Sequence, residues 1–162
     1  MEFIIERLRN VLLEQGWRYD VVDAVLVAQG HNPARANRAV RELSAWVSRQ
    51  DWSSILPAYA RCVRITREYV ERFPVDPTNF VELAEQELFE TLLQAESAER
   101  QAGSAGGFLS AFEPMIPAVN HFFDAVLVMA EDERLRRNRL GMLQRISALA
   151  DGVADLSKLE GF

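Results

Sequence analysis

The sequence contains a single cysteine, Cys62, and only two histidines, His31 and His121. One cysteine excludes an intramolecular disulfide framework and a cysteine-rich metal site, and this sparse use of cysteine favours the reducing cytoplasm. The two histidines do not stand at metal-ligand spacing from each other or from Cys62. The sequence therefore predicts neither a disulfide scaffold nor a metal site.

Long hydrophobic runs are also missing. The longest, residues 125–130, is too short to span a bilayer, and no N-terminal segment has the order of a signal peptide. The glycine-rich stretch at residues 103–107 lacks the Lys-Ser/Thr of a phosphate-binding loop, and no Gly-x-Ser-x-Gly nucleophile motif occurs. We therefore expect a soluble protein with no membrane partner, no bound cofactor and no catalytic residue in this chain.

The composition and periodicity predict an all-α helical bundle. With 162 residues, 49% of them hydrophobic and 26% charged, the chain suits a single globular domain over residues 1–162. Apolar residues recur at intervals of three and four, and no segment alternates as a strand does. The expected helices span residues 2–14, 19–29, 33–49, 51–73, 81–101, 108–117 (interrupted by Pro114 and Pro117), 119–130 and 134–156, with a flexible loop at 103–107. Asn32 is the expected N-cap of the helix that Pro33 begins, and Leu127 is expected on the buried side of the helix at 119–130.

Charge is unevenly distributed along the chain. The net charge of −6 argues against a nucleic-acid partner, but 17 of the 18 basic residues are arginines, Lys158 being the exception, and many of them cluster. The clusters lie at residues 35–41, 61–72 and 134–145, whereas acidic residues gather at 82–99. Such a domain can present a positive surface to a phosphate backbone. For any single arginine, the simpler interpretation is a solvated helix surface with local ion pairs.

Arg139 lies on the stripe of the last predicted helix that should be apolar. A guanidinium group in a core needs a carboxylate partner, because burying an unpaired charge is costly. The candidate partners are Asp124, Glu131 and the acidic helix near Glu85. We predict a buried structural charge formed by Arg139 and Asp124.

Several motifs resemble one family. Phe-Phe-Asp-x-Val-x-Val-Met-Ala-x-Asp at residues 122–132, Leu-Arg-x-Asn-Arg-Leu-x-x-Leu at 135–143 and Ala-Asp-Leu-Ser-Lys-Leu at 154–159 resemble the C-terminal end of the bacterial glycyl-tRNA synthetase beta subunit. Residues 58–65 resemble that family's Ala-x-x-Arg-x-x-Asn-Ile pattern, with Arg64 in place of the asparagine. The resemblance covers essentially the whole chain, which would be the last part of a longer subunit.

The resemblance implies a helical anticodon-binding domain of the type shared with arginyl-tRNA synthetase. It implies glycine-specific tRNA as a partner and, through the full beta subunit, the synthetase alpha subunit in a heterotetramer. The alpha subunit would carry out the ATP-dependent glycylation. Cations would contact RNA phosphates, and an amide can read a base edge. The candidate tRNA-binding residues are Arg61, Arg64, Asn120, His121, Arg134, Arg136, Arg137 and Asn138.

Two interpretations remain open at this point. If the family resemblance holds, neutralising Arg134, Arg136 and Arg137 should remove salt-sensitive RNA binding and leave the fold intact. Phe122 and Phe123 are interpreted as core residues rather than as stacking surfaces for bases. The alternative is a structural helical bundle that mediates subunit packing without RNA contact, marked by a large exposed apolar patch and no positive surface. For Asn138 itself, the alternative to reading a base edge is a place in a buried network that holds the last helix.

Overall fold

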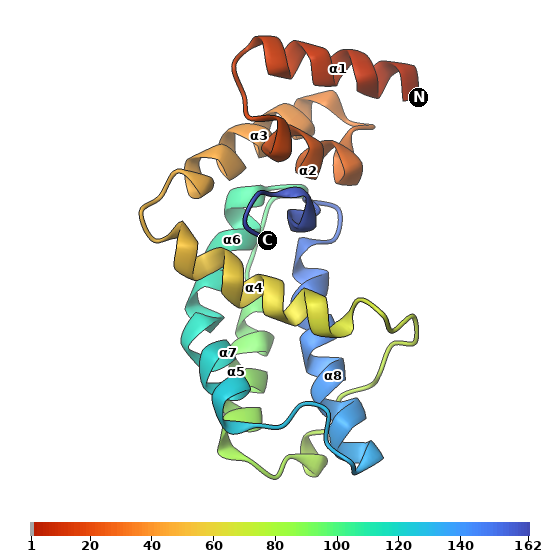
Figure 1. Cartoon of the computed structure of the whole chain (residues 1–162), viewed down its shortest axis with the longest axis vertical. Coiled ribbons are helices and arrows are strands. Elements are labelled where there is room, and N and C mark those ends of the chain that lie inside the picture. The colour runs from red at the N-terminus through yellow and green to blue at the C-terminus, as the bar shows by residue number, and fades with distance from the viewer. Residues whose placement is uncertain (1) are drawn as a thin grey trace. The chain divides into compact units, whose positions relative to one another are not determined.

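The computed structural model describes residues 2–162, which form helices and connecting segments without any strand (Figure 1). The predicted all-α fold is confirmed. Within these residues, no helix has both the length and the apolar character needed to cross a lipid bilayer. The α-helices are α1 (Glu2–Glu14), α2 (Tyr19–Gln29), α3 (Pro33–Val47), α4 (Trp52–Thr66), α5 (Leu83–Ser97), α6 (Ala105–Phe112), α7 (Ile116–Ala125) and α8 (Glu133–Ser147), and the short 3-10 helices are η1 (Pro77–Asn79), η2 (Glu113–Met115), η3 (Ala148–Ala150) and η4 (Leu156–Lys158).

The chain divides into two compact units, and the boundaries between them fall within or beside α4, α5, α6 and α8. Unit 1 comprises the chain up to Pro57 together with Glu99–Ser110 and Ala150–Phe162. Unit 2 comprises Ala58–Ala98 and Ala111–Leu149. The expectation that residues 1–162 form a single domain stays a prediction.

Unit 1 is organised around α2, which packs against α1, α3 and η4. Asn32 caps α3 as predicted, because its side-chain oxygen accepts a hydrogen bond from the Arg35 N–H at 3.2 Å. Asp20 is buried at the start of α2, where Arg18 and the Glu160 N–H both bind its carboxylate. Burial raises the pKa of Asp20, but these hydrogen bonds outweigh burial and hold its pKa below the ordinary value.

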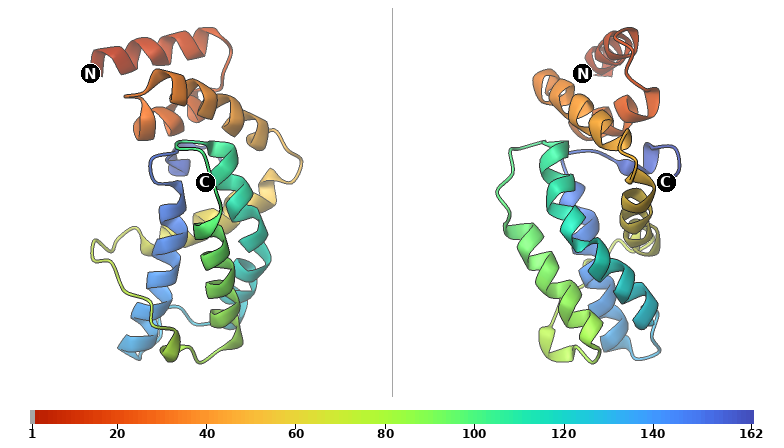
Figure 2. Two further views of the ribbon diagram at one scale, coloured as in Figure 1. Left: turned by 180° about the vertical axis from the view of Figure 1, so that it is seen from behind. Right: turned by 90° about the vertical axis from the view of Figure 1, so that its left-hand side faces the viewer.

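Unit 2 is a bundle in which α5 packs against both α7 and α8 (Figure 2). Its core includes Leu88 and Leu92 of α5, Phe122 of α7 and Met142 of α8, each with no exposed surface. The second half of α4 belongs to the same unit, and Tyr59 donates a hydrogen bond of 2.7 Å to the Ser147 carbonyl. This unit holds every candidate tRNA-binding residue predicted from the sequence.

The helix predicted over residues 51–73 is shorter than expected, since α4 ends at Thr66. The Gln144 side chain of α8 accepts a hydrogen bond from the Phe73 N–H at 3.0 Å and donates one of 2.8 Å to the Glu71 carbonyl. These backbone groups are therefore satisfied by a distant side chain rather than by a longer helix. Residues 67–76 instead form a connector that passes beside α8.

Three further boundaries differ from the prediction. The helix predicted to reach residue 130 ends at Ala125, and Leu127, expected inside, is 69% exposed. The last long helix ends at Ser147, and the chain then turns at Gly152, whose φ of +73° favours glycine. Residues 105–107, expected in a flexible loop, begin α6, because the Ser104 hydroxyl accepts the Gly107 N–H at 2.9 Å and caps the helix.

Candidate nucleic-acid interface

Arg139 is buried, and Glu85 is its partner. Its Nε lies 2.6 Å from a Glu85 carboxylate oxygen, and its Nη1 donates to the Leu127 carbonyl at 2.6 Å. The other Glu85 oxygen accepts the N–H groups of Val81 and Glu82 at 2.7 and 2.8 Å. Burial raises the pKa of Glu85, but Arg139 and the backbone donors hold it below the ordinary value.

The predicted buried charge at Arg139 therefore agrees with the structure, and the assignment of Asp124 as its partner is wrong. Asp124 is exposed near the end of α7, whereas Glu85 lies in the first turn of α5 with no exposed surface. Periodicity identified Arg139 as buried, but the identity of its partner depends on how α5 and α8 pack. The pair is a structural element of unit 2.

The other arginines of the α8 cluster are also mostly bound within the protein. Arg136 donates to the Ala130 carbonyl at 3.0 Å. Arg137 pairs with Glu71 at 3.1 Å and Glu133 at 3.6 Å. Arg134 is exposed at the first turn of the helix. These interactions neutralise or occupy most of the charge that the sequence suggested for RNA phosphates.

Asn138 is 2% exposed and binds the backbone of the connector. Its carbonyl oxygen accepts the Asp76 N–H at 2.6 Å, and its amide nitrogen donates to the Asp76 carbonyl at 3.1 Å. Reading a base edge would break both bonds, so the geometry supports the alternative interpretation of a buried network. On α7, His121 lies 2.9 Å from Glu87, and Asn120 is exposed.

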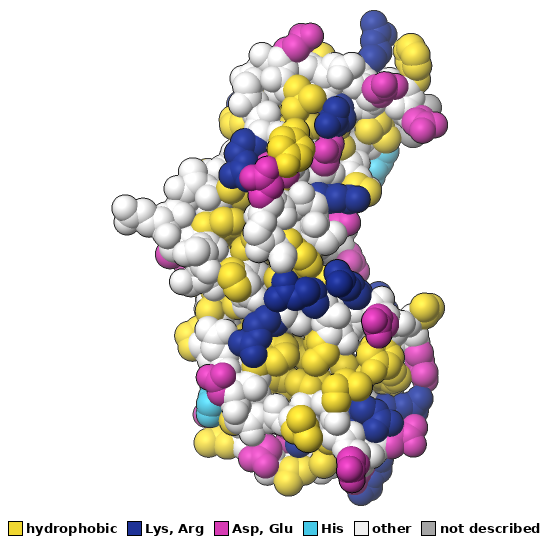
Figure 3. Space-filling view, in the orientation of Figure 1, with side chains coloured by type: hydrophobic (Ala, Val, Ile, Leu, Met, Phe, Trp, Pro, Cys, Tyr) yellow, Lys and Arg dark blue, Asp and Glu magenta, His cyan; other side chains and the backbone are white. Residues whose placement is uncertain are grey.

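The second half of α4 carries a different group of arginines. Arg61 and Arg64 are three residues apart, so they share one side of the helix, and Arg67 follows at its end. Neither Arg61 nor Arg67 has a carboxylate oxygen within 4.0 Å among residues 2–162. Figure 3 shows basic side chains over α4, bordering an area of hydrophobic side chains. This surface combines available positive charge with apolar area.

Aromatic and sulfur-containing side chains border these arginines. The Arg61 guanidinium lies over the Phe123 ring, 4.2 Å from its centroid, and Phe123 is half-buried. The Tyr69 hydroxyl lies 3.9 Å from the sulfur of Met129, which is 46% exposed. We call the set formed by Arg61, Arg64, Arg67, Tyr69, Phe123 and Met129 the α4 face.

Sequence reasoning placed only part of the α4 face. It selected Arg61 and Arg64, assigned Phe123 to the core and did not name Tyr69 or Met129 as candidate binding residues. The last two were expected within helices, whereas both lie in irregular segments. The one sequence feature that pointed to the α4 face was Arg64, because the related family pattern has asparagine at that position.

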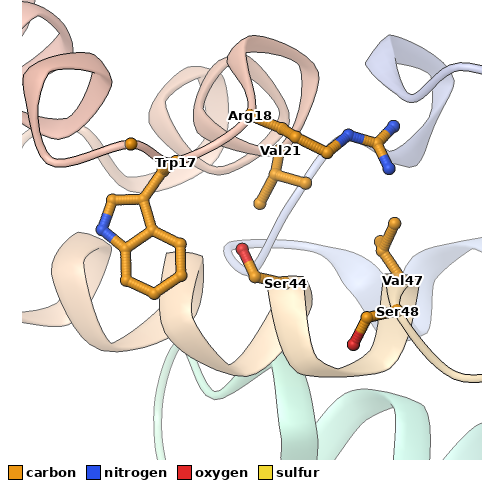
Figure 4. A pocket seen from close by; sticks show the side chains of 7 residues that line it. Trp17, Arg18, Val21, Ser44, Val47 and Ser48 are labelled. Carbon is orange, nitrogen blue, oxygen red and sulfur yellow. The ribbon is translucent and has the colours of Figure 1, made fainter.

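The cavities in unit 1 offer no comparable set of groups. One, of about 150 Å³, lies between α2 and α3, and Figure 4 shows Trp17 and Arg18 at its edge with Ser44 and Ser48. Arg18 is bound to Asp20, at 2.6 Å. Another is lined mainly by Ile5, Leu26 and Val27, beside the Arg9–Asp23 ion pair, and also by Lys158. Among residues 2–162, no group of three or more His, Cys, Asp or Glu side chains is arranged to hold a metal ion.

Comparison with known families gives a match over more than half of the chain. Residues 55–156 match the family described as the DALR anticodon binding domain. The chain belongs to this family. The matched range of the DALR domain includes all of unit 2, and therefore the whole α4 face.

The chain is similar to glycine–tRNA ligase beta subunits over nearly its whole length. It is 35% identical over 162 residues to that of Moorella thermoacetica, covering 98% of this chain and 23% of the relative. It is 35% identical over 164 residues to that of Desulfitobacterium hafniense, with the same coverage, 98% and 23%. For Acidithiobacillus ferrooxidans the identity is 33% over 170 residues, covering 99% and 24%. The chain thus spans about a quarter of the length of these relatives.

Proposed function

We propose that this chain is the anticodon-binding domain of a glycine–tRNA ligase beta subunit and binds the anticodon loop of glycine-specific tRNA. In this proposal it contributes no catalytic residue and no cofactor site. The alpha subunit of a heterotetramer carries out the ATP-dependent glycylation, in the cytoplasm. The DALR match over residues 55–156 and the names of the similar proteins support the proposal.

The observation that carries the proposal is the α4 face within the DALR range. Recognition of single-stranded RNA loops requires cations for the phosphates and flat side chains on which unstacked bases can lie. Arg61 and Arg67, without carboxylate partners among residues 2–162, supply positive charge, and the half-buried Tyr69 supplies a flat side chain on the same face. A net charge of −6 does not oppose this function, because the positive charge is local.

One observation favours the structural alternative, a bundle that packs on another subunit. Val81 and Leu83 are each 67% exposed, and Leu127 is 69% exposed. Glu85 and Arg139 hold these segments near each other, because Glu85 binds the Val81 N–H and Arg139 binds the Leu127 carbonyl. The basic α4 face supports RNA binding over this alternative, since subunit packing alone requires no positive surface.

The test is a titration of the chain with glycine-specific tRNA at low and moderate salt, beside a transcript with a different anticodon. We expect a preference for the glycine anticodon. The double substitution Arg61→Gln and Arg67→Gln should weaken binding about tenfold or more and lower the salt slope by roughly two, because two positive charges would be lost from the surface that faces the RNA.

The matched control is Arg7→Gln with Arg41→Gln in unit 1, which removes the same charge from two exposed arginines. This control should bind RNA as the unaltered chain does. Equal weakening by the two double variants would show that only net charge matters. Equal affinity for both transcripts, or no binding, would contradict anticodon recognition and favour the structural bundle.

A further inference from the structure

Arg61 and Phe123 form a cation–π contact within the α4 face. The guanidinium carbon lies 4.2 Å from the centroid of the Phe123 ring. Phe123 is itself held edge-on against Phe122, with centroids 5.7 Å apart and an interplanar angle of 80°. Because Phe122 has no exposed surface, the core fixes the orientation of Phe123 and hence the surface that supports Arg61. Little ordering of these groups would be needed on binding.

Other arginines of the described residues also lie over rings, but they hold carboxylates as well. Arg137 lies over Phe73 and pairs with Glu71, and Arg145 lies over Phe89 and pairs with Glu96. In unit 1, Arg49 lies over Trp46 and pairs with Asp51. Arg61 has no carboxylate within 4.0 Å among residues 2–162. Its charge and N–H groups therefore remain available to a ligand.

We propose that Arg61, supported by Phe123, is a stacking platform for one unpaired anticodon base of the bound RNA. The inference rests on the proposed function and names the residues that would receive a base. The guanidinium lies over the Phe123 ring, and Arg61 is only half-buried, so part of its surface is accessible. Arginine planes and aromatic rings are the surfaces on which single-stranded bases stack.

A base explains this arrangement better than a phosphate does. A phosphate interacts with the charge, which a lysine would also supply, whereas stacking requires the planar guanidinium group. A phosphate-binding arginine needs no aromatic support, and in the proposed function the exposed Arg67 is the arginine of this face that would bind a phosphate. The exposed Met129 and its neighbour Tyr69 extend the apolar part of the same face, which also suits bases more than phosphates.

The test measures binding of the whole chain to an RNA hairpin with the glycine anticodon and to three hairpins that each lack one anticodon base. An abasic nucleotide keeps its phosphate, so it separates base contacts from backbone contacts. Arg61→Lys should weaken binding to the intact hairpin about fivefold to about a hundredfold, the range for loss of one stacked base. The salt slope should not change, because the charge is retained.

The diagnostic result is that Arg61→Lys no longer weakens binding when one particular anticodon base is absent from the hairpin. At that position the unaltered chain should already bind as weakly as Arg61→Lys binds the intact hairpin, and the substitution should add nothing. Arg137→Lys is the matched control, since Arg137 also lies over a ring but is paired with Glu71, and it should bind every hairpin normally. Phe123→Leu should reproduce the effect of Arg61→Lys, with thermal melting to verify that it folds.

Two outcomes separate this inference from the function on which it rests. If the chain prefers the glycine anticodon but Arg61→Lys has the same effect on all four hairpins, the stacking platform is wrong and anticodon binding stands. If the unaltered chain binds glycine-specific and anticodon-swapped hairpins equally, the proposed function fails, and the assignment of Arg61 to an anticodon base fails with it.

Discussion

The α4 face and helix α8 are both rich in arginine, yet the protein uses the two groups differently. On α8, Arg139 is buried against Glu85, and Arg137 is paired with Glu71. On the α4 face, Arg61 rests on Phe123 without a carboxylate within 4.0 Å among residues 2–162. The difference shows that clustering in sequence does not determine whether an arginine is available to a ligand. Tertiary partners determine it.

The α8 arginines are occupied because α8 is the helix around which the connector of unit 2 is arranged. Asn138 binds both backbone groups of Asp76, and Gln144 binds Phe73 and the Glu71 carbonyl. The α4 face lacks such tethers at Arg61 and Arg67. Substitutions on α8 should therefore change the unfolding free energy, whereas substitutions on the α4 face should change the RNA affinity.

The largest effect on stability should come from Glu85→Gln, which leaves the buried Arg139 without its counter-charge. Removing one partner of a buried ion pair costs about 3–5 kcal/mol of unfolding free energy. Urea unfolding at neutral pH would measure the loss. If Glu85→Gln were as stable as the unaltered chain, α8 would not depend on its buried arginine, and the contrast between the two regions would weaken.

The same pair makes a prediction about pH. The folded-state pKa of Glu85 is held below its ordinary value of 4.5, so its contribution is complete above that pH and is lost as pH falls through the folded pKa. The pKa of Asp20 is also held below its ordinary value, so the unaltered chain loses stability in acid for a second reason. The difference in unfolding free energy between the unaltered chain and Glu85→Gln should therefore shrink in acid, which isolates the Glu85 contribution.

Sequence reasoning predicted most of the local structure, because local signals set it. The all-α class, the Asn32 cap with Pro33 and the burial of Arg139 all follow from residues close in the chain. The predicted ends of α4 and α7 were wrong. Gln144 and Arg139 bind backbone carbonyl groups that would otherwise accept hydrogen bonds within longer helices. Long-range side-chain contacts override helix propensity at such positions.

The candidate site was less predictable than the fold. A charge pattern identifies Arg61 and Arg137 equally well, and only packing places Phe123 beneath one and Glu71 beside the other. Asn138 was a reasonable base reader from its chemistry, but the extended connector reaches it and uses both of its polar atoms. Partners that are about 60 residues distant in sequence leave no local signal.

A smaller effect is expected from Gly141→Ala in α8. An added methyl group would lie 2.5 Å from the Phe73 carbonyl oxygen, so the connector would have to shift, at a cost of about 1–3 kcal/mol. Gly106→Ala in α6 is the control, because its nearest contact would be an ordinary 3.5 Å to Glu42, and helix propensity should then stabilise it by roughly 0.5–1 kcal/mol. Denaturant unfolding of both variants would show opposite signs if α8 is packed as tightly against the connector as the structure shows.

The smallest effect is expected from Arg137→Gln, which most directly separates α8 from the α4 face. Arg137 is exposed and its ion pairs with Glu71 and Glu133 lie at the surface, so the unfolding free energy should change by less than about 1 kcal/mol. Its charge is already balanced by these carboxylates, so RNA affinity should change far less than in Arg61→Gln. Parallel titrations of the two single variants test this directly, since they remove the same charge. A loss of affinity at Arg137 as large as at Arg61 would mean that RNA displaces the carboxylates and that the binding surface extends from the α4 face onto α8.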